Sequence, residues 1–138
     1  RSANSFQTVN QEAESILARL GLVDQRSQLG RSLAYGQQRA LEVALALATE
    51  PTALLLDEPT AGMSPAETVE MVKFIESLPR SLTMLIVEHD MDVVFTLADG
   101  ITVLHYGEVI AEGTPSEVRA NPMVQQIYLG TPSALFHH

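Results

Sequence analysis

Apolar residues in the first half of the chain change from helical to strand spacing. In the segment 10–20 they recur at helical intervals, and Gly21 follows where a C-terminal helix cap would stand. The segment GQQRALEVALALATEP is rich in alanine and leucine and stops at Pro51, which predicts a second, mostly buried helix. Next comes ALLLD, residues 53–57, a continuous apolar run typical of a strand covered on both faces in a parallel sheet.

Capping residues and a second apolar run define the elements that follow. Ser64, Pro65 and Glu67 form a capping box with proline at the first helical position, which predicts a helix through about Leu78. We expect the inward-facing residues of this helix to be Val69, Val72 and Ile75. The run LTMLIVE, residues 82–88, predicts a second buried strand.

The last third of the chain combines short helices with a hairpin. Asp90 is a natural N-cap for a short helix in DMDVVFTLA. ITVLHY and EVIAE indicate two strands joined by a hairpin turn around Gly107. A C-terminal helix follows, breaks near Pro122 and resumes to Gly130. The capping box that starts this helix consists of Thr114, Pro115 and Glu117.

This order of elements predicts an α/β fold with a parallel sheet and a C-terminal hairpin and helix. The 138 residues, 46 % of them hydrophobic, fit one globular domain. The net charge of -9 and the scattered basic residues argue against nucleic acid as a partner. The absence of cysteine excludes disulfides and thiolate metal sites. Without a membrane-length apolar run or a signal-peptide pattern, we expect a soluble chain unless a partner holds it to a membrane.

Two adjacent carboxylates, Asp57 and Glu58, end the first predicted strand. Ligands of an open parallel sheet bind at the carboxyl ends of its strands, where both acids would lie. Successive strand residues point in different directions, so one acid could hold Mg²⁺ while the other orients an attacking water. For the pair alone, acids that mark the point where a strand meets solvent are an equally good explanation.

Two further features strengthen the chemical interpretation. His89 follows the second predicted strand at the same end of the sheet, although a lone histidine there is more often structural than catalytic. Gly36 stands immediately before a helix, where free N–H groups and the helix dipole favour an anion. Together with the carboxylates, these features indicate a polyphosphate ligand.

Four short motifs in register resemble those of ATP-binding-cassette (ABC) ATPases. LAYGQQR resembles the signature motif, LLLDEP the Walker B strand, AGMS the D-loop and VEHD the H-loop. The motifs and the ending VIAEGTPSEVRANP are most similar to the ATPase subunits of branched-chain (hydrophobic) amino acid importers, with urea-importer ATPases as close relatives. The resemblance implies a partial P-loop NTPase-like fold. Residues 1–50 would be the end of the helical subdomain with the signature motif, and 51–130 would carry Walker B, the D-loop and the H-loop.

The resemblance also implies residue roles. Asp57 would anchor Mg²⁺ through water, Glu58 would polarise the attacking water, and His89 would contact the γ-phosphate of ATP. The signature motif would meet the nucleotide bound to a second ATPase subunit in a head-to-tail dimer, and the D-loop would take part in subunit communication. The positions concerned are Ala34, Tyr35, Gly36 and Gln37 in the signature motif and Ala61, Gly62, Met63 and Ser64 in the D-loop.

In the family, such subunits work with transmembrane permease subunits. The resemblance therefore implies a cytoplasmic location, peripheral on the inner face of the cell membrane.

The sequence departs from the family pattern at two positions of these motifs. Ala34 and Tyr35 stand where the common signature has serine and glycine, so the serine hydroxyl to the γ-phosphate is missing. Ser64 stands at the D-loop position often occupied by aspartate, and a helix N-cap explains it fully. The role of Ser64 in subunit communication is therefore a weaker inference.

The larger departure is the P-loop, for which the sequence has no G-x-x-x-x-G-K-[ST] match. The only lysine, Lys73, lies on a predicted helix with no glycine near it. The segment that would carry the adenine-stacking aromatic and the Q-loop glutamine is missing too. The chain therefore resembles the C-terminal portion of an ABC ATPase, and by itself it is expected to be inactive and to bind ATP and Mg²⁺ only weakly.

The sequence leaves two alternative functions open and predicts one further property of the isolated chain. One alternative function is a non-catalytic interaction module derived from an ABC ATPase. Another is a chromosome-maintenance or DNA-repair ATPase, against which the acidic charge balance and the transporter-type ending EGTPSEV stand. Because the P-loop strand would lie beside LTMLIVEH, we also expect an unpaired strand edge and self-association that buries Leu82, Met84, Ile86 or their neighbours.

Overall fold

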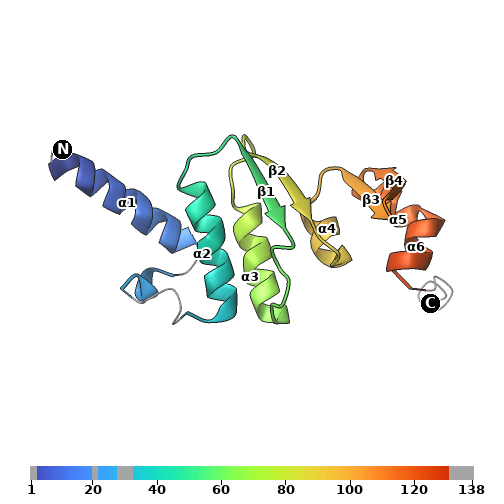
Figure 1. Cartoon of the computed structure of the whole chain (residues 1–138), viewed down its shortest axis with the longest axis horizontal. Helices are drawn as coiled ribbons and strands as arrows, with labels where there is room; N and C mark the ends of the chain where they lie inside the picture. The colour runs from blue at the N-terminus through green and yellow to red at the C-terminus, as the bar shows by residue number, and fades with distance from the viewer. Residues whose placement is uncertain (1–2, 20–21, 28–32, 131–138) are drawn as a thin grey trace. The chain divides into compact units, whose positions relative to one another are not determined.

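A computed structural model describes residues 3–19, 22–27 and 33–130 of the chain (Figure 1). The chain divides into two compact units, Arg1–Val87 and Glu88–His138, and each is described by itself. In the described part of the chain, no helix has the length and apolar character needed to cross a membrane.

The described residues of the first unit form three helices, one short 3₁₀ helix and two strands. In chain order they are α1 (Ala3–Arg19), η1 (Val23–Gln25), α2 (Tyr35–Leu47), β1 (Ala53–Asp57), α3 (Pro65–Glu76) and β2 (Thr83–Val87). The predicted helix at 10–20 is present but begins earlier, at Ala3. The expected cap at Gly21 lies outside the described residues.

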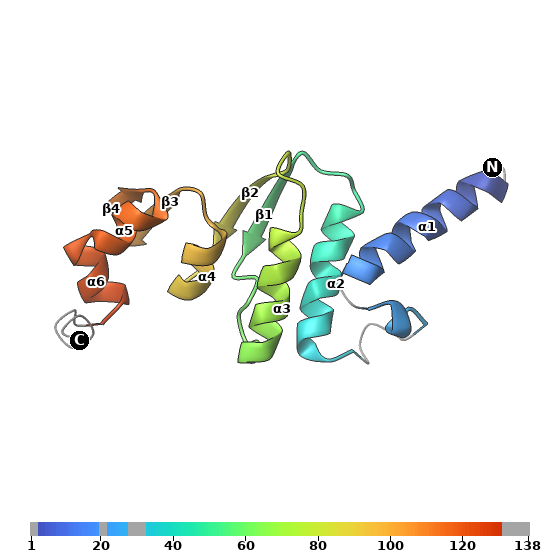
Figure 2. The same ribbon diagram turned by 180° about the vertical axis from the view of Figure 1, so that it is seen from behind.

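Helix α2 is less buried than its apolar composition predicts. Only Val43 and Ala44 are buried, whereas Leu45 is 64 % exposed. The helix packs against α3, and both views show the two side by side next to β1 (Figures 1 and 2). The expectation of a mostly buried helix is therefore wrong, because α2 uses only one stripe of its surface for packing.

The two strands form the predicted parallel pair, in which Leu55 lies opposite Leu85 and Asp57 opposite Val87. Among the described residues of the first unit, only one face of this sheet is covered. Leu54 and Leu56 are buried on that face, whereas Leu55 is 71 % exposed on the other. Coverage on both faces, expected from the continuous apolar runs, is therefore wrong.

The second strand, β2, is similarly less buried than predicted. Leu85 is 60 % and Val87 54 % exposed, while Met84 and Ile86 are half-buried. The exposed apolar surface of β2 is thus carried by Leu85 and Val87 rather than by Leu82, Met84 and Ile86. We call Leu55, Leu85 and Val87 the open face of the sheet.

Helix α3 begins where the sequence predicts, but it buries a different face from the predicted one. The Ser64 hydroxyl accepts a hydrogen bond from the Glu67 backbone N–H at 3.2 Å, which is N-cap geometry. Ile75 is buried as expected and Val72 is half-buried, but Val69 is 50 % exposed. The buried stripe consists of Met71, Phe74, Ile75 and, just past the helix, Leu78, at the i, i+3, i+4, i+7 spacing of a packed helix face.

Up to residue 130, the second unit contains three short helices and a hairpin. They are α4 (Met91–Leu97), β3 (Ile101–His105), β4 (Glu108–Gly113), α5 (Pro115–Ala120) and α6 (Pro122–Tyr128). The strands pair antiparallel around the turn Tyr106-Gly107, where both φ angles are positive, as a two-residue type I′ hairpin requires. The buried core of this unit consists of Ile101, Val103, Val118 and Val124.

Side-chain caps begin all three of these helices. Asp90 Oδ1 accepts from the backbone N–H groups of Asp92 and Val93 at 3.1 and 3.3 Å. Thr114 caps α5, and Asn121 ends α5 and caps α6. The predicted caps and the break near Pro122 are therefore confirmed.

Candidate functional site

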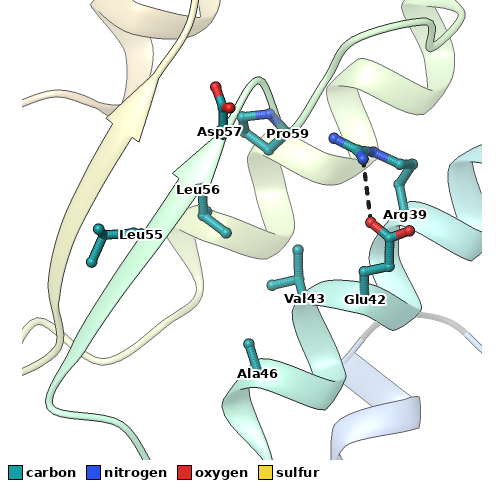
Figure 3. Close-up of a pocket in the computed structure, with 8 residues that line it drawn as sticks. All are labelled: Arg39, Glu42, Val43, Ala46, Leu55, Leu56, Asp57 and Pro59. Carbon is teal, nitrogen blue, oxygen red and sulfur yellow. Dashed lines mark hydrogen bonds and ion pairs between the residues drawn. The ribbon is translucent and has the colours of Figure 1, made fainter.

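The two predicted site carboxylates follow one another at the end of β1. Asp57 is the last residue of the strand and is exposed, and Figure 3 shows it beside Pro59 at the strand end. Glu58 has φ 46°, in the left-handed region that residues other than glycine seldom adopt. Such a conformation costs about 1–3 kcal/mol and persists only where neighbouring groups hold it.

Three hydrogen bonds hold the Glu58 backbone. Its N–H donates to the carbonyl of Val87 on β2 at 2.7 Å, and its carbonyl accepts from the N–H of Ala61 at 3.1 Å. The same carbonyl accepts from Arg39 Nη2 on α2 at 2.9 Å. Sequence reasoning missed Arg39, because nothing local connects two residues 19 positions apart.

A pocket of about 210 Å³ lies between α2 and β1 in the first unit (Figure 3). The guanidinium of Arg39 donates to Glu42 Oε2 at 3.2 Å and points toward the loop that holds Pro59. The residues lining the pocket are Arg39, Glu42, Val43, Ala46, Leu55, Leu56, Asp57 and Pro59. The polar groups gather at the end where β1 stops, and the rest of the lining is mostly apolar.

The structure brings the signature motif and the D-loop together. A Cβ built on Gly62 would lie 3.1 Å from the Tyr35 ring, and Gly62 has φ 74°. A Cβ on Gly36 would collide with the Glu67 carboxylate, in the first turn of α3. The positive φ favours glycine at position 62, whereas at position 36 a side chain would displace the Glu67 carboxylate, and the sequence alone indicated neither contact.

The signature motif forms the beginning of α2. Gln37 Oε1 accepts from the Ala34 N–H at 3.2 Å, so this side chain folds back onto the start of its own helix. Ala34 is exposed and Tyr35 is 49 % exposed. Because α2 begins at Tyr35, its first N–H groups have no carbonyl partner within the helix, as an anion site requires.

The D-loop is a pair of tight turns. The Ala61 N–H donates to the Glu58 carbonyl, and the Met63 N–H donates to the Thr60 carbonyl at 3.2 Å. The Ser64 hydroxyl is engaged at the start of α3. This geometry agrees with the helix-cap explanation of Ser64.

The remaining predicted site residue, His89, belongs to the second unit. It is exposed and lies between β2 and α4. Its place relative to Asp57 and Glu58 stays a prediction. Within residues 3–19, 22–27 and 33–130, no group of three or more His, Cys, Asp or Glu side chains could hold a metal ion. A magnesium ion bound through one carboxylate, phosphate oxygens and water needs no such group, and the exposed Asp57 fits that donor set.

Comparisons with known proteins agree with the motifs. The family model "ABC transporter" matches residues 2–61, and "Branched-chain amino acid ATP-binding cassette transporter" matches residues 108–134. The high-affinity branched-chain amino acid transport ATP-binding protein LivG of Salmonella typhimurium is 43 % identical over 120 residues, which cover 86 % of this chain and 47 % of LivG. BraF of Pseudomonas aeruginosa, with the same description, is 41 % identical over 116 residues, which cover 83 % of this chain and 46 % of BraF.

Solved structures give the same result. An ATP-binding cassette of an ABC transporter superimposes with a TM-score of 0.76 at 32 % identity, covering 86 % of this chain and 49 % of the other. The chain spans about half the length of the curated relatives it matches. These findings confirm the partial α/β fold and the resemblance inferred from the motifs. The chain belongs to the ABC transporter family of ATP-binding proteins, and its relatives and its C-terminal match lie in the branched-chain amino acid group of that family.

Proposed function

We propose that this chain is part of an ATP-hydrolysing subunit of an ABC importer for branched-chain amino acids. The observation that carries the proposal is the identity of 41 to 43 % with BraF and LivG over most of the chain. The match of residues 108–134 to the branched-chain amino acid model favours this substrate class over urea.

The two carboxylates divide the chemistry in this proposal. Asp57 holds Mg²⁺ through water, and Glu58 orients and polarises the water that attacks the γ-phosphate. Bound Mg²⁺ supplies charge neutralisation for the phosphates. His89 contacts the γ-phosphate. Hydrogen bonds fix the backbone of the turn that begins at Glu58, which we call the held turn. This suits the proposed role, because a carboxylate that orients water needs a fixed backbone position.

The signature motif works on a nucleotide bound to a second subunit. In this proposal the free N–H groups at the start of α2, at Tyr35, Gly36 and Gln37, face the phosphates across a head-to-tail dimer. The D-loop residues Ala61, Gly62, Met63 and Ser64 lie beside the signature motif and communicate between the subunits. Permease subunits are the membrane partners, and the complex places the chain on the cytoplasmic face of the membrane.

A second candidate function is a non-catalytic interaction module. Residues 1–138 taken by themselves would act in this way, because they contain no P-loop motif and their only lysine, Lys73, lies on α3 with its ammonium 3.7 Å from Glu70. Without a P-loop, the α- and β-phosphates lack their main ligands.

The coding region upstream of Arg1 distinguishes the two functions. An in-frame P-loop there is expected for the importer ATPase. In the longer protein that carries such a P-loop, phosphate release can be measured in the presence of permease subunits. Its rate should rise when a branched-chain amino acid and its binding protein are added. Glu58→Gln should abolish the rise. Absence of a P-loop, or phosphate release that is unchanged in Glu58→Gln, would favour the interaction module.

A further inference from the structure

We propose that Arg39 is a positioning residue that holds the backbone of Glu58 and thereby links the signature helix α2 to the water-orienting carboxylate. The role of that carboxylate rests on the proposed function. The link between Arg39 and the Glu58 backbone rests on the geometry of the first unit.

The Arg39 guanidinium donates in two directions. Nη2 donates to the Glu58 carbonyl at 2.9 Å, and Nη1 donates to Glu42 Oε2 at 3.2 Å. The Arg39 side chain is 26 % exposed, whereas the Glu42 side chain is 65 % exposed. Figure 3 shows the guanidinium extending from α2 toward the loop after β1, with Glu42 beneath it.

The bond to the Glu58 carbonyl is the more consequential of the two. The pair with Glu42 is an exposed i,i+3 ion pair, a class that contributes little to stability. The bond to the carbonyl is partly buried and charge-assisted, and such bonds are about twice as strong as neutral ones. Glu42 therefore serves mainly to orient the guanidinium.

The conformation of Glu58 explains what the bond accomplishes. A residue with φ 46° returns to an ordinary conformation unless its neighbours hold it. The hydrogen bonds that its carbonyl accepts from Ala61 and Arg39 stabilise the observed orientation of that peptide group. Releasing Arg39 would let the peptide rotate and would move the carboxylate that the same residue carries.

The link also gives the signature motif a route to the catalytic carboxylate. Arg39 lies one turn into α2, two residues after Gln37 and at the end of LAYGQQR. A shift of α2 that accompanies nucleotide contact at its N-terminus would change the bond to Glu58. The geometry thus connects contact at the signature motif with the position of the group that activates water.

Amide hydrogen exchange on this 138-residue chain tests the link without any need for ATP. The two reporter amides are that of Glu58, which donates to the Val87 carbonyl on β2, and that of Ala61, which donates to the Glu58 carbonyl. In Arg39→Gln their exchange should accelerate about tenfold or more, because a charge-assisted bond is lost. Arg39→Lys keeps one donor and should recover part of the protection.

Glu42→Gln is the matched control. It removes the ion pair but leaves the guanidinium able to reach the Glu58 carbonyl, so exchange at 58 and 61 should change by less than about twofold. Equal exchange in Arg39→Gln and Glu42→Gln, or protection in Arg39→Gln that matches the unsubstituted chain, would overturn the proposal. Faster exchange over the whole first unit would also overturn the proposal, because such a change indicates a general loss of folding.

The positioning role can be tested by ATPase kinetics in a protein that contains both this chain and a P-loop. Arg39→Gln should lower kcat about tenfold or more with little change in KM, and it should have little further effect in a Glu58→Gln background. Additive losses in the double variant would contradict positioning through Glu58. If the unsubstituted protein fails to hydrolyse ATP, the proposed function is wrong, and the exchange measurement still decides whether Arg39 holds the turn.

Discussion

Replacing Leu55 by lysine should weaken self-association of this chain about 100-fold. Leu55 lies on the open face of the two-stranded sheet, opposite Leu85 and next to Val87. The exposed fractions of these three residues are 71, 60 and 54 %. Apolar side chains that lie together on one uncovered face favour burial against a second surface, and each strand of a two-stranded sheet also has a free edge.

The exposures set the size of the effect. Burying a whole leucine or valine side chain contributes about 2 kcal/mol, so covering the exposed parts of the open face contributes about 4 kcal/mol per copy and about 7 kcal/mol per dimer. Association costs at least about 4 kcal/mol of this free energy. Burial of the open face alone therefore gives a dimer with a dissociation constant in the millimolar range. A few backbone hydrogen bonds along the free strand edge, about 1 kcal/mol each, would bring the dissociation constant to between about 10 µM and 1 mM.

Leu55→Lys removes about 1.5 kcal/mol of that burial from each copy and about 3 kcal/mol from a dimer, which is the 100-fold weakening. The substitution changes the net charge from -9 to -8, so stronger repulsion cannot explain a weaker dimer. Sedimentation equilibrium across a dilution series measures the dissociation constant directly.

Leu45→Lys on α2 is the matched control, because Leu45 is 64 % exposed but lies outside the open face. Its dissociation constant should stay within about threefold of the unsubstituted chain. A monomer that persists at millimolar concentration, or a Leu45→Lys variant that dissociates as readily as Leu55→Lys, would refute the reasoning.

Three other predictions concern nucleotide, chemistry and stability. Because its sequence has no P-loop, the 138-residue chain should neither hydrolyse ATP nor bind Mg-ATP with micromolar affinity, and a calorimetric titration showing tight binding would contradict this. In a protein that also carries a P-loop, Glu58→Gln should lower turnover by roughly 10²-fold with ATP binding intact, whereas Asp57→Asn should weaken Mg²⁺-dependent binding; identical kinetics in the two variants would disprove the division of roles. Ile75→Ala should lower the free energy of unfolding by about 2–5 kcal/mol and the exposed Val69→Ala by less than about 1 kcal/mol, as urea denaturation can measure; equal losses would mean that the buried stripe of α3 is misplaced.

The sequence alone was sufficient for the helix caps and the hairpin, which depend on near neighbours. Asp90, Thr114 and Asn121 begin helices where the sequence predicts a start or a break, because a capping side chain bonds to N–H groups two or three residues away. The order of strands and helices and the parallel pairing of β1 with β2 were predicted in the same way. The motifs were likewise sufficient for the family, because four short patterns in the correct order rarely coincide by chance.

The motifs predict Asp57, Glu58 and the glycines of the signature motif and the D-loop as site residues, and this assignment stays a prediction. The motifs did not indicate what surrounds these residues. The close approach of Gly36 to Glu67 and of Tyr35 to Gly62 joins segments that are separate in the sequence, and no spacing rule relates them.

Only the tertiary structure decided which faces are covered and what holds the turn at Glu58. A continuous apolar run such as ALLLD is compatible with one covered face or two, so the exposure of Leu55 depends on which elements pack against the sheet. Helical periodicity similarly permits either of two neighbouring stripes on α3, and packing against the rest of the first unit selected the one through Met71. The bond from Arg39 to the Glu58 carbonyl spans 19 residues, and it exists because α2 and the loop after β1 meet in space. Local chemistry acts over about one helical turn, whereas burial and long-range hydrogen bonds depend on elements that the fold brings together.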